Sequence, residues 1–319
     1  MSNNGDQGKW NGEEDEKHAD TTQWGMVGEK TYKGFPQTQT VLPSGIYNIT
    51  LDRNDDRPMF VRRIVKMDDI FDLKEAITKS MLKEINEFWD KEKTFKKMGF
   101  LHRRGYLLYG PQGTGKSSVI KQIMKEVVDN GGLVFMCENP EFFNKALTTL
   151  RRAEPERQLL CVFEDIDAII NKYGDDELLS VLDGANMVDR VLNIATTNYP
   201  ERLDRRIIAR PRRFDRVVKV DVPNEAVRRE FFMHQIPKAG KKKIDALVLA
   251  TKGLSMAALS EVIISTYCLG NTMKETIEIL RAMEDDNPMS SDFGEQEEIG
   301  FAGGGTKSRT VDDILESLD

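Results

Sequence analysis

The sequence predicts an α/β fold: a parallel sheet flanked by helices, followed by a smaller all-helical segment. Three observations support this prediction. Short apolar runs of strand length alternate with stretches whose apolar residues recur at helical spacing, which is typical of successive βα units. Two of these runs end directly in glycines or acids, as strands do at the functional edge of a parallel sheet. From residue 224 to residue 282 the apolar residues recur only at helical spacing.

The chain before the sheet is expected to contribute little to the core. Residues 1–38 are rich in Gly, Asn, Asp, Glu and Lys and show little periodicity, which predicts a disordered tail. Strands are predicted over 45–51 and 59–66, and the polar stretch between them favours a hairpin. We assign this hairpin to a small N-terminal module at 39–67, with an edge addition to the main sheet as the alternative. An amphipathic helix is predicted from Asp72 to Lys97.

A glycine-rich motif follows the apolar run 105–109, which reads as a buried strand. The motif is Gly110-Pro111-Gln112-Gly113-Thr114-Gly115-Lys116-Ser117-Ser118, and a helical pattern continues from it. A strand, this loop and a helix form the Walker A context, in which backbone N–H groups close around phosphates at the positive end of a helix dipole. Lys116 would reach the β- and γ-phosphates, and the Ser117 hydroxyl would bind Mg²⁺. The sequence therefore predicts a site for ATP with Mg²⁺.

Two further strand ends carry polar residues that suit nucleotide hydrolysis. The run 158–163 ends in Glu164-Asp165-Ile166-Asp167, the Walker B arrangement, in which one acid serves Mg²⁺ and its neighbour polarises the attacking water. The strand predicted over 190–195 leads to Thr196-Thr197-Asn198. Asn198 would orient that water, with a turn-forming Asn as the alternative.

An arginine-rich stretch covers residues 205–216. Such close cations need anionic partners. Two alternatives stay open: a basic patch for nucleic acid, or arginines that reach a neighbouring subunit's γ-phosphate, as arginine fingers do.

The motifs together resemble the AAA family of ATPases over residues 68–282, and within it the Bcs1-like branch. The specific matches are Arg103 to Pro111, the order Glu164-Asp165-Ile166-Asp167, Thr196-Thr197-Asn198, Leu203-Asp204 and Arg210-Pro211. This resemblance implies a nucleotide-binding domain at 68–222 and a helical lid at 223–284. It implies the sensor-1 role for Asn198 and arginine-finger roles for Arg210 and Arg213. It places Met256 and Ala257 beside the adenine, together with Asp69 and Ile70, although ordinary core packing is the alternative for Ile70 and Met256.

Three departures from the family pattern bear on function. Most members carry Asp and then Glu at the Walker B end, whereas here Glu164 would face the metal and Asp165 would take the catalytic place, which predicts slow hydrolysis or exchanged roles. The aromatic pore loop of the family is not recognisable between Pro140 and Arg157, which counts against threading of an unfolded polypeptide. The membrane anchor of the Bcs1 proteins is not found.

Composition narrows the location and the partners. The net charge of −7 disfavours broad nucleic-acid binding. Cys137, Cys161 and Cys268 lie in apolar segments without metal-ligand spacing, so we expect buried free thiols in a reducing compartment. No apolar run has transmembrane length and no hydrophobic signal segment begins the sequence, which predicts a cytoplasmic protein without a membrane partner. His102 is expected at the surface.

The last residues form a distinct pattern. From 285 the composition becomes acidic and Gly-rich, which predicts a flexible linker. In the final segment, 310–319, Val311, Ile314, Leu315 and Leu318 recur at helical spacing after Thr310, which can act as an N-cap. A docking peptide for a partner and a frayed tail are the two interpretations.

The leading prediction is an ATP-hydrolysing homo-oligomeric ring of six or seven subunits that acts on a folded protein or a protein complex. One alternative is an ATP-gated scaffold or switch with little turnover. The other is a nucleic-acid motor or loader, which the acidic net charge does not favour.

Overall fold

The chain divides into two compact units, Met1–Pro43 and Ser44–Asp319. A computed structural model describes the following residues: 23–28, 31–35, 38–52, 56–64, 76–183, 189–208 and 212–285.

The first unit contains a two-stranded antiparallel ladder that the sequence analysis did not predict. Strand β1 (Gln23–Gly28) pairs with β2 (Thr31–Phe35). The assignment of all of 1–38 to a disordered tail is therefore wrong over these strands. The polar average of the segment concealed a short stretch with Trp, Tyr, Thr and Phe, which are residues of high β-propensity.

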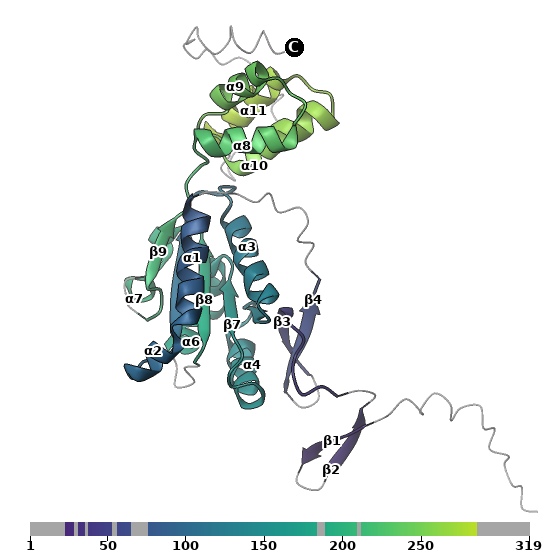
Figure 1. The fold of residues 1–319 in the computed structure, drawn as a ribbon, viewed down its shortest axis with the longest axis vertical. Helices are drawn as coiled ribbons and strands as arrows, with labels where there is room; N and C mark the ends of the chain where they lie inside the picture. Colours follow the sequence, from purple (N-terminus) through teal and green to yellow (C-terminus); the bar gives the residue numbers. More distant parts are fainter. Residues whose placement is uncertain are drawn as a thin grey trace, which may run out of the picture. The chain divides into compact units, whose positions relative to one another are not determined.

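The second unit is built on a seven-stranded sheet with the order β4-β3-β6-β7-β8-β5-β9 (Figure 1). Every neighbouring pair is parallel except β3 with β4. This confirms the predicted parallel sheet. The strands are β3 (Gly45–Leu51), β4 (Pro58–Arg63), β5 (Arg103–Tyr109), β6 (Leu133–Met136), β7 (Leu159–Phe163), β8 (Val191–Thr197) and β9 (Arg216–Lys219).

The predicted hairpin is present, but it is not a separate module. Strand β3 pairs in parallel with β6, so that β3 and β4 extend the main sheet at one edge. Ile46, Tyr47 and Ile49 of β3 are buried. The hairpin joins the sheet because burying these side chains requires an adjacent layer, which two strands alone do not supply.

Helices cover both faces of the sheet. The described helices of this region are α1 (Ala76–Asp90), α2 (Glu92–Lys97), α3 (Lys116–Asp129), α4 (Pro140–Ala153), α5 (Ile166–Tyr173), α6 (Asp175–Asp183) and α7 (Arg205–Ile208), with a 3₁₀ turn at Pro200–Arg202. On β6, Val134 and Met136 belong to the buried cluster formed with α1 and α3, whereas Phe135 faces Phe143 of α4. This alternation follows from the two-residue period of a strand and explains why β6 is apolar throughout.

Two predictions at the start of this region need correction. The helix predicted from Asp72 to Lys97 is interrupted at Lys91, and residues 72–75 lie outside the described part. His102 is not at the surface. It is 1% exposed, its ring stacks on that of Phe88 at 4.1 Å, and its Nε2 lies 2.8 Å from the Phe88 carbonyl oxygen. The break after α1 leaves an aromatic pocket that the imidazole fills.

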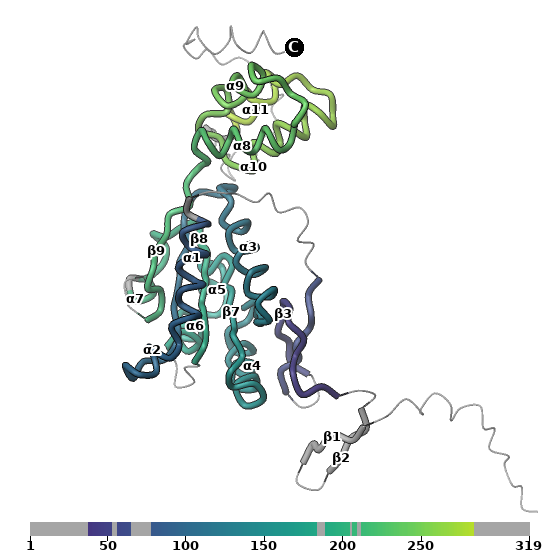
Figure 2. The backbone as a smooth tube through the Cα atoms, in the orientation of Figure 1, coloured from purple at the N-terminus to yellow at the C-terminus, as the bar shows by residue number. Residues whose placement is uncertain are grey.

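The helical lid follows the sheet, as predicted. Its elements are α8 (Glu225–Gln235), α9 (Lys241–Ala250), α10 (Met256–Ile263), a π-helical turn (Ile264–Cys268) and α11 (Met273–Asp285), drawn in green to yellow in Figure 2. They share one buried cluster with Phe232, Leu247 and Leu259 at its centre. Cys268 is exposed, contrary to prediction, while Cys137 and Cys161 are buried. Among the described helices of the chain, none combines the length and apolarity needed to cross a membrane.

The strand register determines where the polar strand ends meet. Tyr109, at the end of β5, lies beside Thr197 of β8, and Phe163, at the end of β7, lies beside Ala195 of β8. Because these strands are parallel, their carboxyl ends share one edge of the sheet. The glycine-rich loop, the two acids and the Thr-Thr-Asn segment are therefore brought together by backbone pairing alone.

Candidate active site

The glycine-rich loop wraps the start of α3 in a conformation that needs its glycines. Gly113 and Gly115 have φ values of 74° and 104°, in the left-handed region that glycine favours. A Cβ on Gly110 would lie 2.1 Å from the Val220 carbonyl oxygen, so this loop entrance admits no side chain. The result is an open helix N-terminus with backbone N–H groups available to an anion, as the sequence predicts.

Lys116, in the first turn of α3, is buried and folds over the loop. Its Nζ donates hydrogen bonds to the carbonyl oxygens of Gly110, at 2.8 Å, and Pro111, at 2.7 Å. Burial lowers the pKa of the Lys116 ammonium, and the nearby Asp165 carboxylate partly opposes that shift. The ammonium is thus held against the loop by neutral carbonyl groups, which leaves it free to exchange them for phosphate oxygens.

Glu164 and Asp165 project from the end of β7 into the same region. Asp165 has a φ of 48°, which is uncommon for a residue other than glycine. Its backbone N–H donates to Thr196 Oγ1 at 3.0 Å, and its Oδ1 accepts from Asn198 Nδ2 at 3.4 Å. Backbone strain of this kind costs on the order of 1–3 kcal/mol and clusters at active sites. Asp is among the few side chains that tolerate this conformation, which is a physical reason for finding the shorter acid here.

Asn198 is held in place by its buried neighbour Thr197. Thr197 Oγ1 donates to Asp167 Oδ1 at 2.7 Å and accepts from the Tyr199 N–H at 3.0 Å. The Thr197 hydroxyl therefore donates one hydrogen bond and accepts another, and these two bonds fix the backbone on either side of Asn198. Asn198 is therefore held where its side chain can donate to Asp165, in addition to its place before Tyr199 and Pro200.

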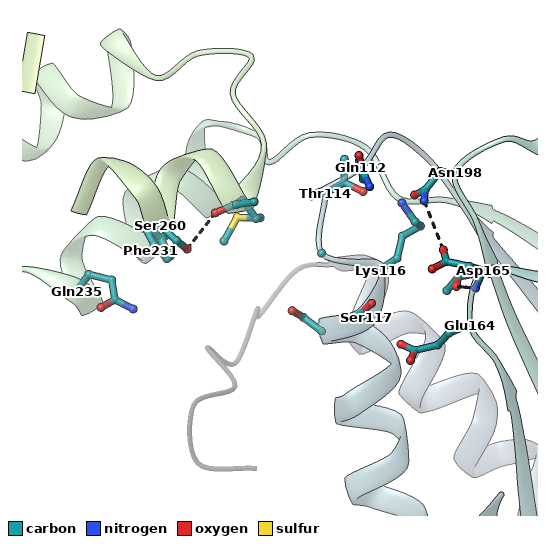
Figure 3. Close-up of a pocket in the computed structure, with 16 residues that line it drawn as sticks. Gln112, Thr114, Lys116, Ser117, Glu164, Asp165, Asn198, Phe231, Gln235 and Ser260 are labelled. Carbon is teal, nitrogen blue, oxygen red and sulfur yellow. Dashed lines mark hydrogen bonds between the residues drawn. The ribbon is translucent and has the colours of Figure 1, made fainter. Parts of the chain in front are cut away.

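These residues enclose a cavity of about 510 Å³ (Figure 3). Figure 3 shows Glu164 and Ser117 at one side of it, Asp165 and Asn198 at another, and Lys116 between them. The lining residues are Gln112, Gly113, Thr114, Gly115, Lys116, Ser117, Ser118, Glu164, Asp165, Thr196, Asn198, Phe231, Gln235, Met256, Ala257 and Ser260.

The lid closes part of this cavity through the start of α10. The Ala257 N–H donates to the Gly113 carbonyl oxygen at 3.2 Å. Ser255 caps the helix by accepting from the Ala258 N–H at 3.2 Å. Met256 and Ala257 line the cavity, and their place beside the adenine stays a prediction.

The donor set suits a magnesium ion. Ser117 contributes a hydroxyl and Glu164 and Asp165 contribute carboxylates, all of them oxygen ligands. Mg²⁺ prefers oxygen and keeps several waters or phosphate oxygens, so few protein ligands are needed. The residues present therefore fit Mg²⁺ bound together with a nucleotide.

Some contributors were missed by the sequence analysis and others lie outside the described residues. Thr196, Phe231, Gln235 and Ser260 line the cavity but were not predicted as site residues. Phe231 and Gln235 stand four apart on α8, and this spacing was the available signal for a shared face. Asp69, Ile70, Arg210 and the segment 310–319 fall outside the described part of the chain.

Arg213, one of the two predicted arginine-finger residues, is buried. It is 4% exposed, forms an ion pair with Asp183 and donates to the Arg206 carbonyl oxygen, all within its own chain. The sequence could not show this, because Asp183 is thirty residues away and reaches Arg213 only through the fold. Arg206 also has partners, at 3.2 Å from Asp175 and 3.1 Å from Asp204. Acids of the same chain therefore neutralise much of the arginine-rich stretch.

Comparison with known proteins agrees with this site. Residues 106–222 match the family described as "ATPase family associated with various cellular activities (AAA)". The chain is 29% identical over 262 residues to the human ATPase family gene 2 protein homolog A, which covers 71% of this chain and 29% of that protein. It is 31% identical over 223 residues to the proteasome-activating nucleotidase of Sulfurisphaera tokodaii, and the match covers 62% of this chain and 55% of that protein. It is 29% identical over 219 residues to the ATP-dependent zinc metalloprotease FtsH 1 of Conexibacter woesei, and the match covers 61% of this chain and 33% of that protein.

In all three relatives the match spans about half of the protein's length or less. The family match runs from the strand before the glycine-rich loop to the end of the sheet, so it contains the loop, the paired acids and the Thr-Thr-Asn segment. Residues 106–222 therefore resemble an ATPase domain of the AAA family, and the residues of the site fit ATP with Mg²⁺ as its cofactor.

Proposed function

We propose that this protein is a homo-oligomeric ring of six or seven subunits that uses ATP hydrolysis to remodel or translocate a protein or a protein complex. Relatives named for proteasome activation and for metalloprotease activity support a protein as the substrate. The Arg103–Pro111 stretch and the Glu-Asp order at the Walker B end support a place in the Bcs1-like branch.

One observation carries the proposal that subunits share their active sites. Among the described residues that line the cavity, Lys116 is the only one with a cationic side chain. Charge builds up on the γ-phosphoryl oxygens in the transition state, and AAA-type catalysis needs further positive charge there. Arg213 is committed to Asp183, which leaves Arg210 as the candidate that a neighbouring subunit supplies.

The residues of the cavity then divide the chemistry among themselves. Lys116 binds the β- and γ-phosphates, and Ser117 with Glu164 holds the cation. When bound, Mg²⁺ neutralises developing charge and orients the phosphates. Asp165 accepts a proton from the attacking water, and Asn198, within hydrogen-bond reach of Asp165, orients that water.

A mixing experiment tests the shared site. Lys116→Ala and Arg210→Ala chains are each expected to lose ATP turnover by about 10³-fold or more, because the first lacks a phosphate ligand and the second the cross-subunit cation. When the two variants are mixed, an intact Lys116 meets an intact Arg210 at some interfaces. Turnover of the mixture is expected to exceed that of either variant by at least tenfold.

The control is Arg206→Ala, which removes an exposed arginine of the same stretch and is expected to leave turnover within twofold. Specific activity of the unmodified chain is expected to rise with protein concentration as rings form. If both variants assemble but their mixture shows no gain in ATP turnover, the shared site is contradicted.

An ATP-gated switch remains a second candidate because of the swapped acids. The shorter Asp165 side chain reaches less far toward a water than Glu would, although its backbone conformation suits Asp. For the ATPase, Asp165→Asn is expected to keep ATP binding and reduce turnover by about 10²–10⁴-fold. A wild type that binds ATP and assembles but turns over no faster than Asp165→Asn would favour the switch. The nucleic-acid alternative is not proposed, because acids of the same chain already partner Arg206 and Arg213.

A further inference from the structure

An apolar groove of about 590 Å³ lies on the helical lid, at the corner where α8 leads into α9. It is separate from the nucleotide cavity and shares no lining residue with it. Met233, at 58% exposure, stands over the groove as a large apolar side chain left in water. The lining residues are Arg229, Met233, Ile236, Pro237, Ala239, Lys241 and Ile244.

The rim of the groove is positively charged. Lys241 lines it, and Lys238 and Lys242 are exposed beside it in the sequence. Within the described ranges, none of these three lysines has an ion-pair partner. Arg229 differs, because Glu225 and Asp245 both pair with it. The groove thus offers apolar surface next to uncompensated positive charge, which suits an apolar segment that also carries acids.

We propose that the segment 310–319 of this same chain docks in this groove as a short amphipathic helix. The segment lies outside the described residues, and its sequence matches the groove in both respects. Its apolar residues Val311, Ile314, Leu315 and Leu318 fall on one face at helical spacing. At 100° per residue, Asp312 and Asp319 stand along one edge of that face, and Asp313 and Glu316 stand further round. No basic residue occurs in the segment.

The tether is long enough for the segment to reach the groove. The described chain ends with α11, whose Arg281 donates to the Ala250 carbonyl oxygen at 2.7 Å, at the end of α9. Lys241 begins α9, so the groove lies about 15 Å away along that ten-residue helix. Residues 286–309 have the composition of a flexible linker, and a flexible chain of 24 residues spans roughly 27 Å. A tether of this length holds the segment near the groove at millimolar effective concentration, which compensates for the marginal stability of so short a helix.

Docking would also reach the ATPase site through α8. This helix presents Phe231 and Gln235 to the nucleotide cavity and Arg229 and Met233 to the groove. A segment bound against α8 therefore biases the position of the residues that line the nucleotide cavity, and nucleotide binding would bias docking by the same factor. This consequence rests on the proposed function, whereas docking itself does not.

Peptide binding without nucleotide tests the docking directly. The chain ending at Arg309 is titrated with a fluorescent synthetic peptide of residues 308–319. We expect saturable binding that weakens at least tenfold with Leu315→Asp in the peptide, and at least tenfold with Lys241→Glu plus Lys242→Glu in the protein. A peptide carrying Asp312→Lys and Asp319→Lys is expected to regain affinity for the charge-reversed protein. Lys252→Glu, an exposed change two residues beyond the far end of α9, is the matched control and should leave binding within twofold.

The full-length chain provides the second measurement. Amide hydrogen exchange over residues 233–244 is expected to be slower in the full chain than in the chain ending at Arg309. Absence of peptide binding at millimolar concentration, binding that ignores the lysine variants, or identical exchange in the two chains would each overturn the proposal. A further outcome would also overturn the proposal. If the lysine variants lose self-association while the chain ending at Arg309 keeps it, the groove binds a second copy of the chain and not the segment 310–319.

Discussion

Arg213 and Asp183 form an ion pair within one chain, between the loop before β9 and the last residue of α6. The arginine is buried, whereas Asp183 keeps 29% of its side chain exposed. Arg213 also donates to the Arg206 carbonyl oxygen, so it links α6 to the region of α7. One of the two predicted finger residues is thus bonded within its own chain. The other, Arg210, lies outside the described residues.

Arg213→Ala is expected to destabilise the fold. Removing one partner of a largely buried pair takes the Arg213 guanidinium from Asp183 and the Arg213 donor from the Arg206 carbonyl, at a cost of about 2–4 kcal/mol. Chemical denaturation of the nucleotide-free protein measures this. Arg206→Ala serves as the matched surface variant and should change the free energy of unfolding by about 0.5 kcal/mol or less. Unaltered stability of Arg213→Ala together with lost turnover would restore the finger role.

Thr196→Val is expected to lower turnover while leaving ATP affinity within twofold. Valine keeps the shape of the buried side chain but removes the acceptor of the Asp165 N–H, and with it the restraint on the unusual backbone at Asp165. We expect turnover to fall by about tenfold or more, and stability to fall by about 1 kcal/mol. Thr196→Ser keeps the hydroxyl and should recover most of the activity. Equal losses in the Val and Ser variants would show that packing, not the hydrogen bond, matters here.

Lys116→Met is expected to abolish ATP binding without destabilising the nucleotide-free fold, because the buried ammonium is unfavourable there. Burial lowers the pKa of Lys116 below its ordinary value of 10.5. Between that lowered pKa and 10.5 the unfolded chain binds more protons than the folded one, so the stability of the wild type rises with pH across this window. Urea denaturation at several pH values compares the two chains. The stability of the wild type relative to Lys116→Met should increase toward pH 10.5, and a decrease would contradict the buried-cation account.

Thiol labelling of the native protein is expected to modify one cysteine per chain. Cys268 is exposed, whereas burial raises the pKa of Cys161 to about 12 and raises that of Cys137 well above its usual range. The thiolate is the reactive form, so the two buried residues should react only on unfolding. Cys268→Ser should remove the fast phase seen with a disulfide reagent at pH 8. A second fast thiol in that variant would show that the sheet opens near β6 or β7.

Local sequence patterns predicted much of the catalytic edge. Strand, glycine turn and helix occur in one unbroken stretch from Arg103 to Asp129, and the acids follow β7 directly, so each motif contains its own structural context. Parallel pairing then brings the strand ends together whatever the side chains are. Asn198 and Asp165 were predicted for the same water and are hydrogen-bonded to each other in the structure.

Contacts between distant segments were beyond the sequence. His102 was expected at the surface, yet the aromatic rings of Phe88 and Phe95 pack against it. The hairpin β3–β4 was predicted from its own residues, but whether it stands alone depends on β6, which is more than eighty residues away. Phe231 and Gln235 reach the cavity only because the lid folds back toward the loop.

By itself, the sequence determined which chemical groups the chain offers: a glycine-rich loop before a helix, two acids, an amide and an acidic amphipathic C-terminal segment. These follow from residue type and spacing over short stretches, where backbone geometry is nearly fixed. The tertiary structure alone decided which charged groups are free to act. Arg213 is paired with Asp183, whereas Lys238, Lys241 and Lys242 have no ion-pair partner among the described residues. The physical reason is that the free energy of a charged side chain depends on its burial and on its partners, and in this chain the fold brings both from segments far away in the sequence.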